Sequence, residues 1–146
     1  MYEQIREVLE TGMTAEIIDR EIYNLALGLT DDQELCKLLT LLAAQEEKHR
    51  DLLARKHHVY GGAASFSYDV KASDLASVDD LVSRDLEALI LYCVNLETRR
   101  ARQYKAAADK VSDTVVRQFL LFLSDEELKH ADRLREAGGL PAEDRQ

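Results

Sequence analysis

Helix-breaking residues are scarce in this sequence of 146 residues, which has six glycines and a single proline, Pro141. That scarcity favours long uninterrupted helices. No apolar run approaches the roughly 20 residues that a membrane-spanning helix needs, so no membrane partner is expected. The N-terminal residues lack the basic start and apolar centre of a signal peptide, and a cytoplasmic location is the default expectation.

Cysteine and positive charge are also in short supply. Cys36 and Cys93 are the only cysteines and have no CxxC spacing, which argues against a disulfide framework and against a four-cysteine metal site. We predict two reduced thiols in the core. The formal net charge is −9, and an acidic surface repels phosphate backbones, so nucleic acid is not an expected partner.

What the sequence does contain is an internal repeat, in which each pattern residue has an equivalent 81 positions later. The pattern is Glu-x6-Tyr followed by Glu-x-x-His, with 30 residues between the two glutamates of each copy. Its members are Glu16, Tyr23, Glu46 and His49 in the first copy, and Glu97, Tyr104, Glu127 and His130 in the second. A lone Glu-x-x-His on a charged helix is usually a solvated coincidence, but coincidence does not account for a second copy with matched tyrosines and spacing.

Helical periodicity and capping residues predict four main helices. Their expected ranges are 15–29 after an N-cap at Thr14, 32–57, 79–110, and 113–137 after a cap at Ser112-Asp113. A short helix over 2–11, broken by Gly12, is expected to precede them. The glycine- and serine-rich stretch 59–78 is the one long connection, with a short strand-like or helical piece expected near 66–70.

Short turns within each pair of helices, and a long connection between the pairs, predict the topology. We expect an all-α, ferritin-like four-helix bundle in which two helical hairpins, 14–58 and 79–137, are joined by the crossover 59–78. The whole chain, 1–146, is expected to form one domain of this kind.

The repeated glutamates and histidines fall on the apolar stripes of their helices, and so are expected to point into the core. The same stripes include Leu25 in the first main helix and Leu86 in the third. Lys48 and Lys129 lie off the stripes and are expected to be solvated. Glu47 and Glu126, which adjoin the repeated glutamates, are expected to face away from the core. His57 and His58, at the end of their helix, are expected at the surface.

Four buried carboxylates need counter-charges, and no lysine or arginine repeats at a matching core position. Two divalent metal ions would supply four positive charges, and the two neutral imidazoles would complete the set. Oxygen-rich ligation with one nitrogen per metal suits iron or manganese better than structural zinc. We therefore expect two iron or manganese ions, or a mixed pair, and a role for Tyr23 and Tyr104 as hydroxyl donors to carboxylates across the bundle.

These motifs resemble those of the rubrerythrin branch of the ferritin-like superfamily, from about residue 15 to about residue 137. The resemblance implies that Glu46 and Glu127 bridge the two irons and that Glu16 and Glu97 are terminal ligands. It also implies that His49 and His130 each complete one iron site, and that the protein is a homodimer.

Two departures from the family pattern stand out. Full rubrerythrins carry a small four-cysteine rubredoxin-like domain that this sequence does not contain, so electrons would come from a separate donor protein. The peroxide-reducing members have an extra glutamate three residues after the terminal one, and here that position is Arg100. Asp19, its repeat equivalent, is a shorter acid that could substitute only in part.

The resemblance and the motifs together predict a non-haem di-iron oxidoreductase that reduces peroxide or dioxygen while oxidising ferrous iron. The six glutamates and histidines of the repeat would be its metal ligands and catalytic residues. Two alternatives remain open from the sequence. One is an iron-binding or storage protein without turnover, and the other is a di-iron hydroxylase of an organic substrate, which would need an apolar cavity beside the metals.

Overall fold

The computed structural model describes residues 2–63, 66–79 and 85–141. Four long helices and two short helical segments make up the regular structure of these ranges, with no strand among them. The long helices are α1 (Glu3–Leu27), α2 (Gln33–Val59), α4 (Leu86–Lys110) and α5 (Thr114–Ala137). The short segments are η1 (Ala72–Leu75) and α3 (Ala76–Asp79). No helix in the described ranges is long and apolar enough to cross a membrane.

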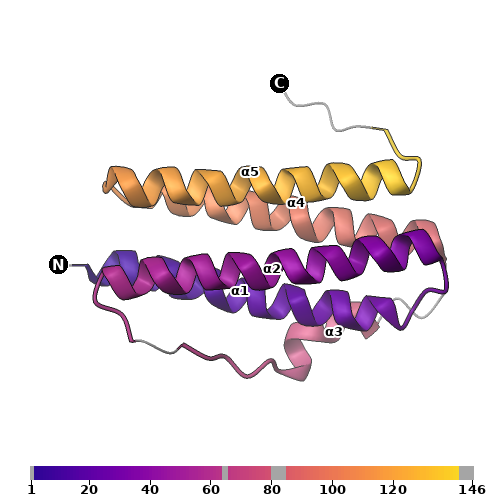
Figure 1. The fold of residues 1–146 in the computed structure, drawn as a ribbon, viewed down its shortest axis with the longest axis horizontal. Helices are drawn as coiled ribbons and strands as arrows, with labels where there is room; N and C mark the ends of the chain where they lie inside the picture. The colour runs from indigo at the N-terminus through magenta and orange to yellow at the C-terminus, as the bar shows by residue number, and fades with distance from the viewer. Residues whose placement is uncertain (1, 64–65, 80–84, 142–146) are drawn as a thin grey trace.

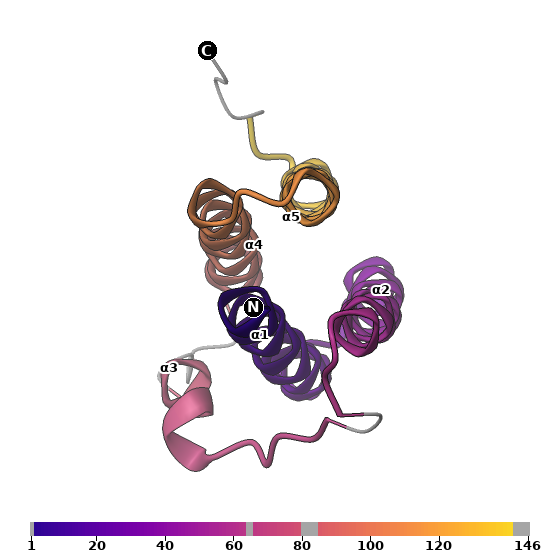
Figure 2. The same ribbon diagram turned by 90° about the vertical axis from the view of Figure 1, so that its left-hand side faces the viewer.

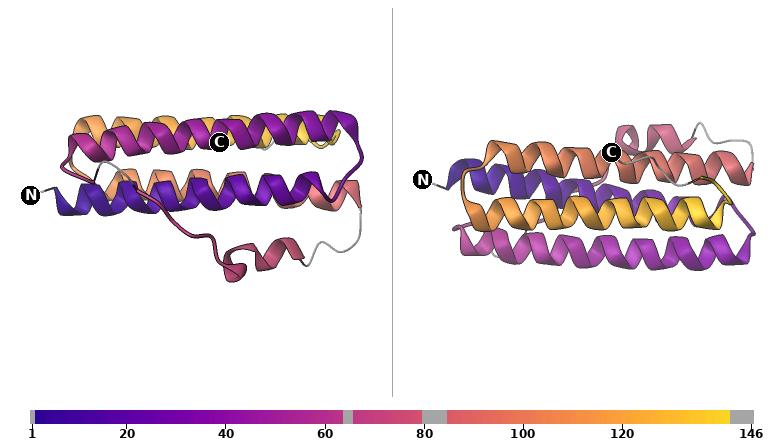
Figure 3. Two further views of the ribbon diagram at one scale, coloured as in Figure 1. Left: turned by 60° about the horizontal axis from the view of Figure 1, so that its bottom comes forward. Right: turned by 90° about the horizontal axis from the view of Figure 1, so that it is seen from above.

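The four long helices form two antiparallel hairpins, α1 with α2 and α4 with α5, that pack side by side (Figure 1). Seen end on, α1 lies next to α4 and α2 faces α5 (Figure 2). The crossover leaves the end of α2 and runs along the outside of α1 before α4 begins (Figure 3). The prediction of a ferritin-like helical bundle is confirmed.

Side-chain caps explain where α2 and α5 begin. Asp32 accepts a hydrogen bond from the Leu35 backbone N–H at 2.9 Å, and Asp113 accepts one from Val116 at 3.0 Å. The predicted stop after α5 also holds, because Gly139 adopts a left-handed φ of 66° directly after the last turn.

The prediction that Gly12 breaks a short first helix is wrong, since α1 runs unbroken from Glu3 to Leu27. Gly12 is buried where three helices meet, and a Cβ there would lie 3.1 Å from Leu53 and 3.3 Å from the Tyr104 ring. A glycine inside a helix costs about 1 kcal/mol relative to alanine. The close approach of α2 and α4, together with burial of Leu9 and Met13 on either side, offsets that cost.

Two predictions about the crossover were also wrong, the position of its helical piece and the start of the helix that follows it. The helical pieces lie at η1 and α3 rather than near 66–70, because Asp74 accepts hydrogen bonds from the Lys71 backbone N–H and the Tyr68 hydroxyl. The helix expected from 79 begins at Leu86, where Asp85 caps the Glu87 N–H at 3.0 Å. The intervening part of that prediction, 80–84, lies outside the described residues.

Two hydrophobic clusters fill the bundle on either side of its centre. One contains Tyr23, Ile22, Cys93 and the crossover residue Val78, and the other contains Leu9, Leu53, Tyr104 and Leu120. Leu25 and Leu86 are exceptions to the predicted stripes, with 41% and 39% of their surfaces exposed near helix ends. Both cysteines are free thiols, Cys93 buried and Cys36 only partly so.

Candidate metal centre

The polar layer between the two hydrophobic clusters is built from all four long helices. Glu16 comes from α1, Glu46 and His49 from α2, Glu97 from α4, and Glu127 and His130 from α5. Each glutamate–histidine pair is three residues apart, so both side chains project from one face of the helix. None of the six is more than 3% exposed. The structure therefore brings the six predicted residues together in the core.

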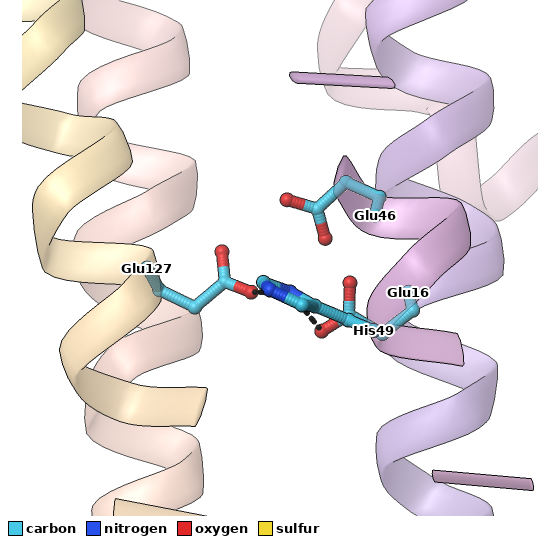
Figure 4. A group of neighbouring side chains, drawn as sticks. All are labelled: Glu16, Glu46, His49 and Glu127. Atoms are coloured by element: carbon cyan, nitrogen blue, oxygen red, sulfur yellow. Dashed lines mark hydrogen bonds and ion pairs between the residues drawn. The ribbon is translucent and has the colours of Figure 1, made fainter. Parts of the chain in front are cut away.

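These side chains form two overlapping groups in which the ligand atoms all lie within 4.8 Å of one another. The first donor group is Glu16, Glu46, His49 and Glu127, and the second donor group is Glu46, Glu97, Glu127 and His130. Glu46 and Glu127 belong to both. In Figure 4 the members of the first donor group converge from α1, α2 and α5 on the space between the hairpins.

The two imidazoles lie against carboxylates from the neighbouring helices. His49 Nδ1 is 3.1 Å from Glu127 Oε1 and 3.6 Å from Glu16 Oε1. His130 Nδ1 is 3.5 Å from both Glu46 Oε1 and Glu97 Oε2. The rings are nearly parallel, with 5.6 Å between their centroids. Each nitrogen thus points toward the same centre as the carboxylates.

The two tyrosines of the repeat lie across the bundle from their own glutamates. Tyr23 on α1 donates its hydroxyl to Glu97 on α4, and Tyr104 on α4 donates to Glu16 on α1. The Glu97 and Glu16 carboxylates are therefore each held by a phenol from the opposite hairpin. This is the contact that the repeat predicts.

Many of the carboxylate oxygens in this layer make no hydrogen bond within the protein. Five carboxylate oxygens make no hydrogen bond although they are buried: Glu16 Oε2, both oxygens of Glu46, Glu97 Oε2 and Glu127 Oε2. An unpartnered buried carboxylate is strongly unfavourable. Four carboxylates and two imidazoles with free, convergent lone pairs fit two hard divalent cations. The residues present are thus compatible with a two-metal centre.

The pKa shifts within the layer differ between its middle and its ends. Burial, reinforced by repulsion from the neighbouring carboxylates, raises the pKa of Glu46 and of Glu127 well above the usual range. Burial also opposes ionisation of Glu16 and Glu97, but contacts with a neighbouring carboxyl, histidine and tyrosine outweigh it and lower each pKa. Ionisation is therefore most costly at Glu46 and Glu127, and a bound cation would stabilise their charged forms most.

A buried ion pair that was not predicted from the sequence lies next to the layer. Arg100 on α4 forms two hydrogen bonds to Asp19 on α1, from Nε to Oδ2 at 2.8 Å and from Nη2 to Oδ1 at 2.7 Å. Asp19 is 1% exposed. The sequence did carry a signal, since the two positions are repeat equivalents with opposite charges and would be expected to face each other.

The prediction that His57 lies at the surface is wrong, because its side chain is buried. Its Nε2 lies 3.0 Å from Glu10 Oε1, and Phe66 of the crossover packs against its ring. A Cβ at Gly62 would lie 2.1 Å from the ring, so glycine lets the backbone cover the imidazole. His57 is four residues after Leu53, so the buried stripe of α2 simply continues for one more turn.

The remaining polar neighbours lie away from the layer. Lys48 is exposed, and Lys129 pairs with Asp125 at 3.3 Å on the surface of α5. Glu47 faces outward and binds Arg20 at 2.5 Å. The lysines are solvated, as predicted.

Comparison with known proteins places this arrangement in context. A solved structure of a hypothetical protein from Pyrococcus furiosus has a TM-score of 0.68 to this chain at 24% identity, covering 90% of this chain and 86% of the other. That likeness supports the fold alone. No curated protein sequence gives a significant match. Residues 7–138 match the Rubrerythrin family, a span that runs from α1 to just past α5. The chain belongs to the rubrerythrin family.

Proposed function

We propose that this protein is a di-iron oxidoreductase that reduces peroxide or dioxygen while oxidising ferrous iron. The observation that carries the proposal is the pair of overlapping donor groups, which share Glu46 and Glu127. Two separate groups would suit two independent ions, whereas two shared carboxylates suit a coupled pair. A coupled pair can deliver two electrons in one reaction, as peroxide reduction requires.

Each residue of the layer has a distinct place in this proposal. Glu46 and Glu127 would contact both ions, Glu16 with His49 would complete the first, and Glu97 with His130 would complete the second. Two ferrous ions held there would supply the two electrons that, with two protons, reduce one hydrogen peroxide to two waters.

The chain's own contribution is to fix these groups in a dry core. Tyr23 and Tyr104 orient the terminal carboxylates through their hydroxyls, and the flanking hydrophobic clusters exclude bulk water. A separate donor protein would return the electrons. A homodimer and manganese or mixed-metal occupancy remain part of the proposal.

The first test is an anaerobic titration of metal-free protein with ferrous iron, counting the ions bound per chain. We expect two, and we expect Glu127→Ala to abolish tight binding of both because its carboxylate belongs to both donor groups. Glu126→Ala is the matched control, since it removes the adjacent, partly exposed carboxylate.

The outcomes of this titration are distinct. A stoichiometry near zero in protein with native circular dichroism would refute the proposal. Two bound ions that neither peroxide nor dioxygen oxidises would leave an iron-binding protein without turnover, which is one of the two alternatives that the sequence leaves open.

A further inference from the structure

A groove of about 600 Å³ lies between the N-terminal part of α1 and the C-terminal part of α4, on the outside of the bundle. Gly12 and Ala15 contribute to its α1 side, and Arg100, Tyr104 and Ala107 to its α4 side. We call it the open groove. Small residues at three of these positions leave room for it.

The floor of the open groove is in direct contact with buried acids. Tyr104, which is 3% exposed, donates its hydroxyl to Glu16 of the first donor group. Arg100, whose side chain is 13% exposed, binds Asp19. A single side chain thus connects the groove to the carboxylate layer.

The repeat provides an internal comparison at the other end of the same α1–α4 seam. There the equivalents of Gly12 and Ala15 are Cys93 and Leu96, both buried. The crossover covers this end, because Val78 and Leu75 pack into the cluster that contains Tyr23, and Ser77 hydrogen-bonds to Tyr92 at 2.7 Å. Figure 2 shows α3 alongside α1 on this face. We call this the covered end.

The polar groups on the floor of the open groove, from Arg100 and Tyr104, favour some small molecules over others. Asp19, the acid at the floor, is already paired with Arg100, so it is not free to attract a ferrous ion on this route. The guanidinium and the phenol suit a small, neutral molecule that both donates and accepts hydrogen bonds.

We propose that the open groove is the route by which hydrogen peroxide reaches the first donor group, with Tyr104 as the positioning residue at its inner end. This inference rests on the proposed di-iron function and deepens it by naming the oxidant and its entrance. The covered end has the same tyrosine–glutamate contact but does not admit hydrogen peroxide.

The openness of the groove can be tested without metal or turnover. Ala107→Cys places a thiol on the groove wall, and Ala26→Cys places one at the repeat-equivalent position, which is 1% exposed. We expect a small methanethiosulfonate reagent to modify Cys at 107 at least about 100-fold faster than at 26, because local opening must precede reaction at a buried site. Wild-type protein corrects for Cys36 and Cys93. Equal rates would overturn the inference.

The route itself is tested by filling the groove. In ferrous-loaded protein, Ala107→Leu should slow oxidation by hydrogen peroxide about tenfold, a barrier increase of about 1.4 kcal/mol, and Ala107→Phe should slow it further. Ala44→Leu, in a shallow groove between α1 and α2, is the matched control and should keep the wild-type rate.

Iron counting on the same samples separates the two hypotheses. Two ions per chain with slower peroxide oxidation supports the route. Two ions with an unchanged rate in both Ala107 variants overturns the route and leaves the di-iron function standing. Failure of the wild-type protein to bind iron refutes the di-iron function, and the route with it.

Discussion

The two ends of the α1–α4 seam carry the same chemistry in different surroundings. At each end a tyrosine donates to a buried glutamate of the opposite hairpin, Tyr104 to Glu16 at the open groove and Tyr23 to Glu97 at the covered end. The open end is lined by glycine and alanine, whereas the covered end is filled by Cys93 and Leu96 and overlaid by the crossover.

This difference shows how a repeated sequence produces a site that is not symmetric. The residues that face the centre are matched between the copies, so the metal-binding layer has near twofold character. On the α1–α4 seam, Gly12 and Ala15 are not matched by their repeat equivalents Cys93 and Leu96, and the crossover can lie on only one side of the bundle. Access is therefore decided by the lining of the seam rather than by the donor groups.

The largest effect is expected midway between the two ends, at the Arg100–Asp19 pair. Arg100→Ala would leave the Asp19 carboxylate buried without its partner, which typically costs about 3 to 5 kcal/mol of unfolding free energy. Urea unfolding of the metal-free protein measures it. The double variant Asp19→Leu/Arg100→Leu removes both charges and should recover most of the loss. If Arg100→Ala alone leaves the free energy of unfolding unchanged, the Arg100–Asp19 pair does not stabilise the packing of one hairpin against the other.

Stability measured as a function of pH distinguishes Glu46 and Glu127, at the centre of the layer, from Glu16 and Glu97 at its ends. The folded protein holds protons on Glu46 and Glu127, whose pKa values are raised, after the unfolded chain has released them. Their contribution to stability is therefore complete below a pH of about 4.5 and is lost as pH rises. Asp19, with its pKa raised by burial to about 7, acts in the same direction. Glu16 and Glu97 have lowered pKa values, so they make stability rise with pH, but only below the usual pKa of a glutamate.

We accordingly expect metal-free protein to be less stable in urea at about pH 8 than at about pH 5. A bound divalent metal should stabilise the protein more at the higher pH, because metal binding displaces the protons of the shared carboxylates. The variant Glu46→Gln/Glu127→Gln serves as control and should flatten the dependence. A metal-free protein that gains stability from pH 5 to pH 8 would contradict this assignment.

The smallest effect compares the two tyrosines directly. Tyr23→Phe and Tyr104→Phe each remove one hydrogen bond to a buried carboxylate, a loss of about 1 to 3 kcal/mol. Water can replace the lost hydroxyl from the open groove but not at the covered end, so Tyr23→Phe should cost about 1 kcal/mol more. Thermal or urea unfolding of the two variants measures the difference. Equal losses would show that the two ends are equally wet.

The sequence was most informative where side chains follow helical periodicity. Two copies of one spacing placed six glutamates and histidines on four inward faces, and all six meet in the structure. The same reasoning failed at Gly12, because a glycine breaks an isolated helix but allows close packing inside a bundle. It also failed at His57, because a histidine at the end of a helix is exposed only if no loop returns over it.

The sequence by itself determined the four helices, their pairing and the repeated carboxylate–histidine pattern, because these depend on spacing along one chain. Only the tertiary structure decided that Asp19 and Arg100 meet, that the crossover covers one end of the α1–α4 seam, and that the other end stays open. The physical reason is that contacts between helices depend on the volumes of side chains from distant segments. No periodicity within a single helix records those volumes.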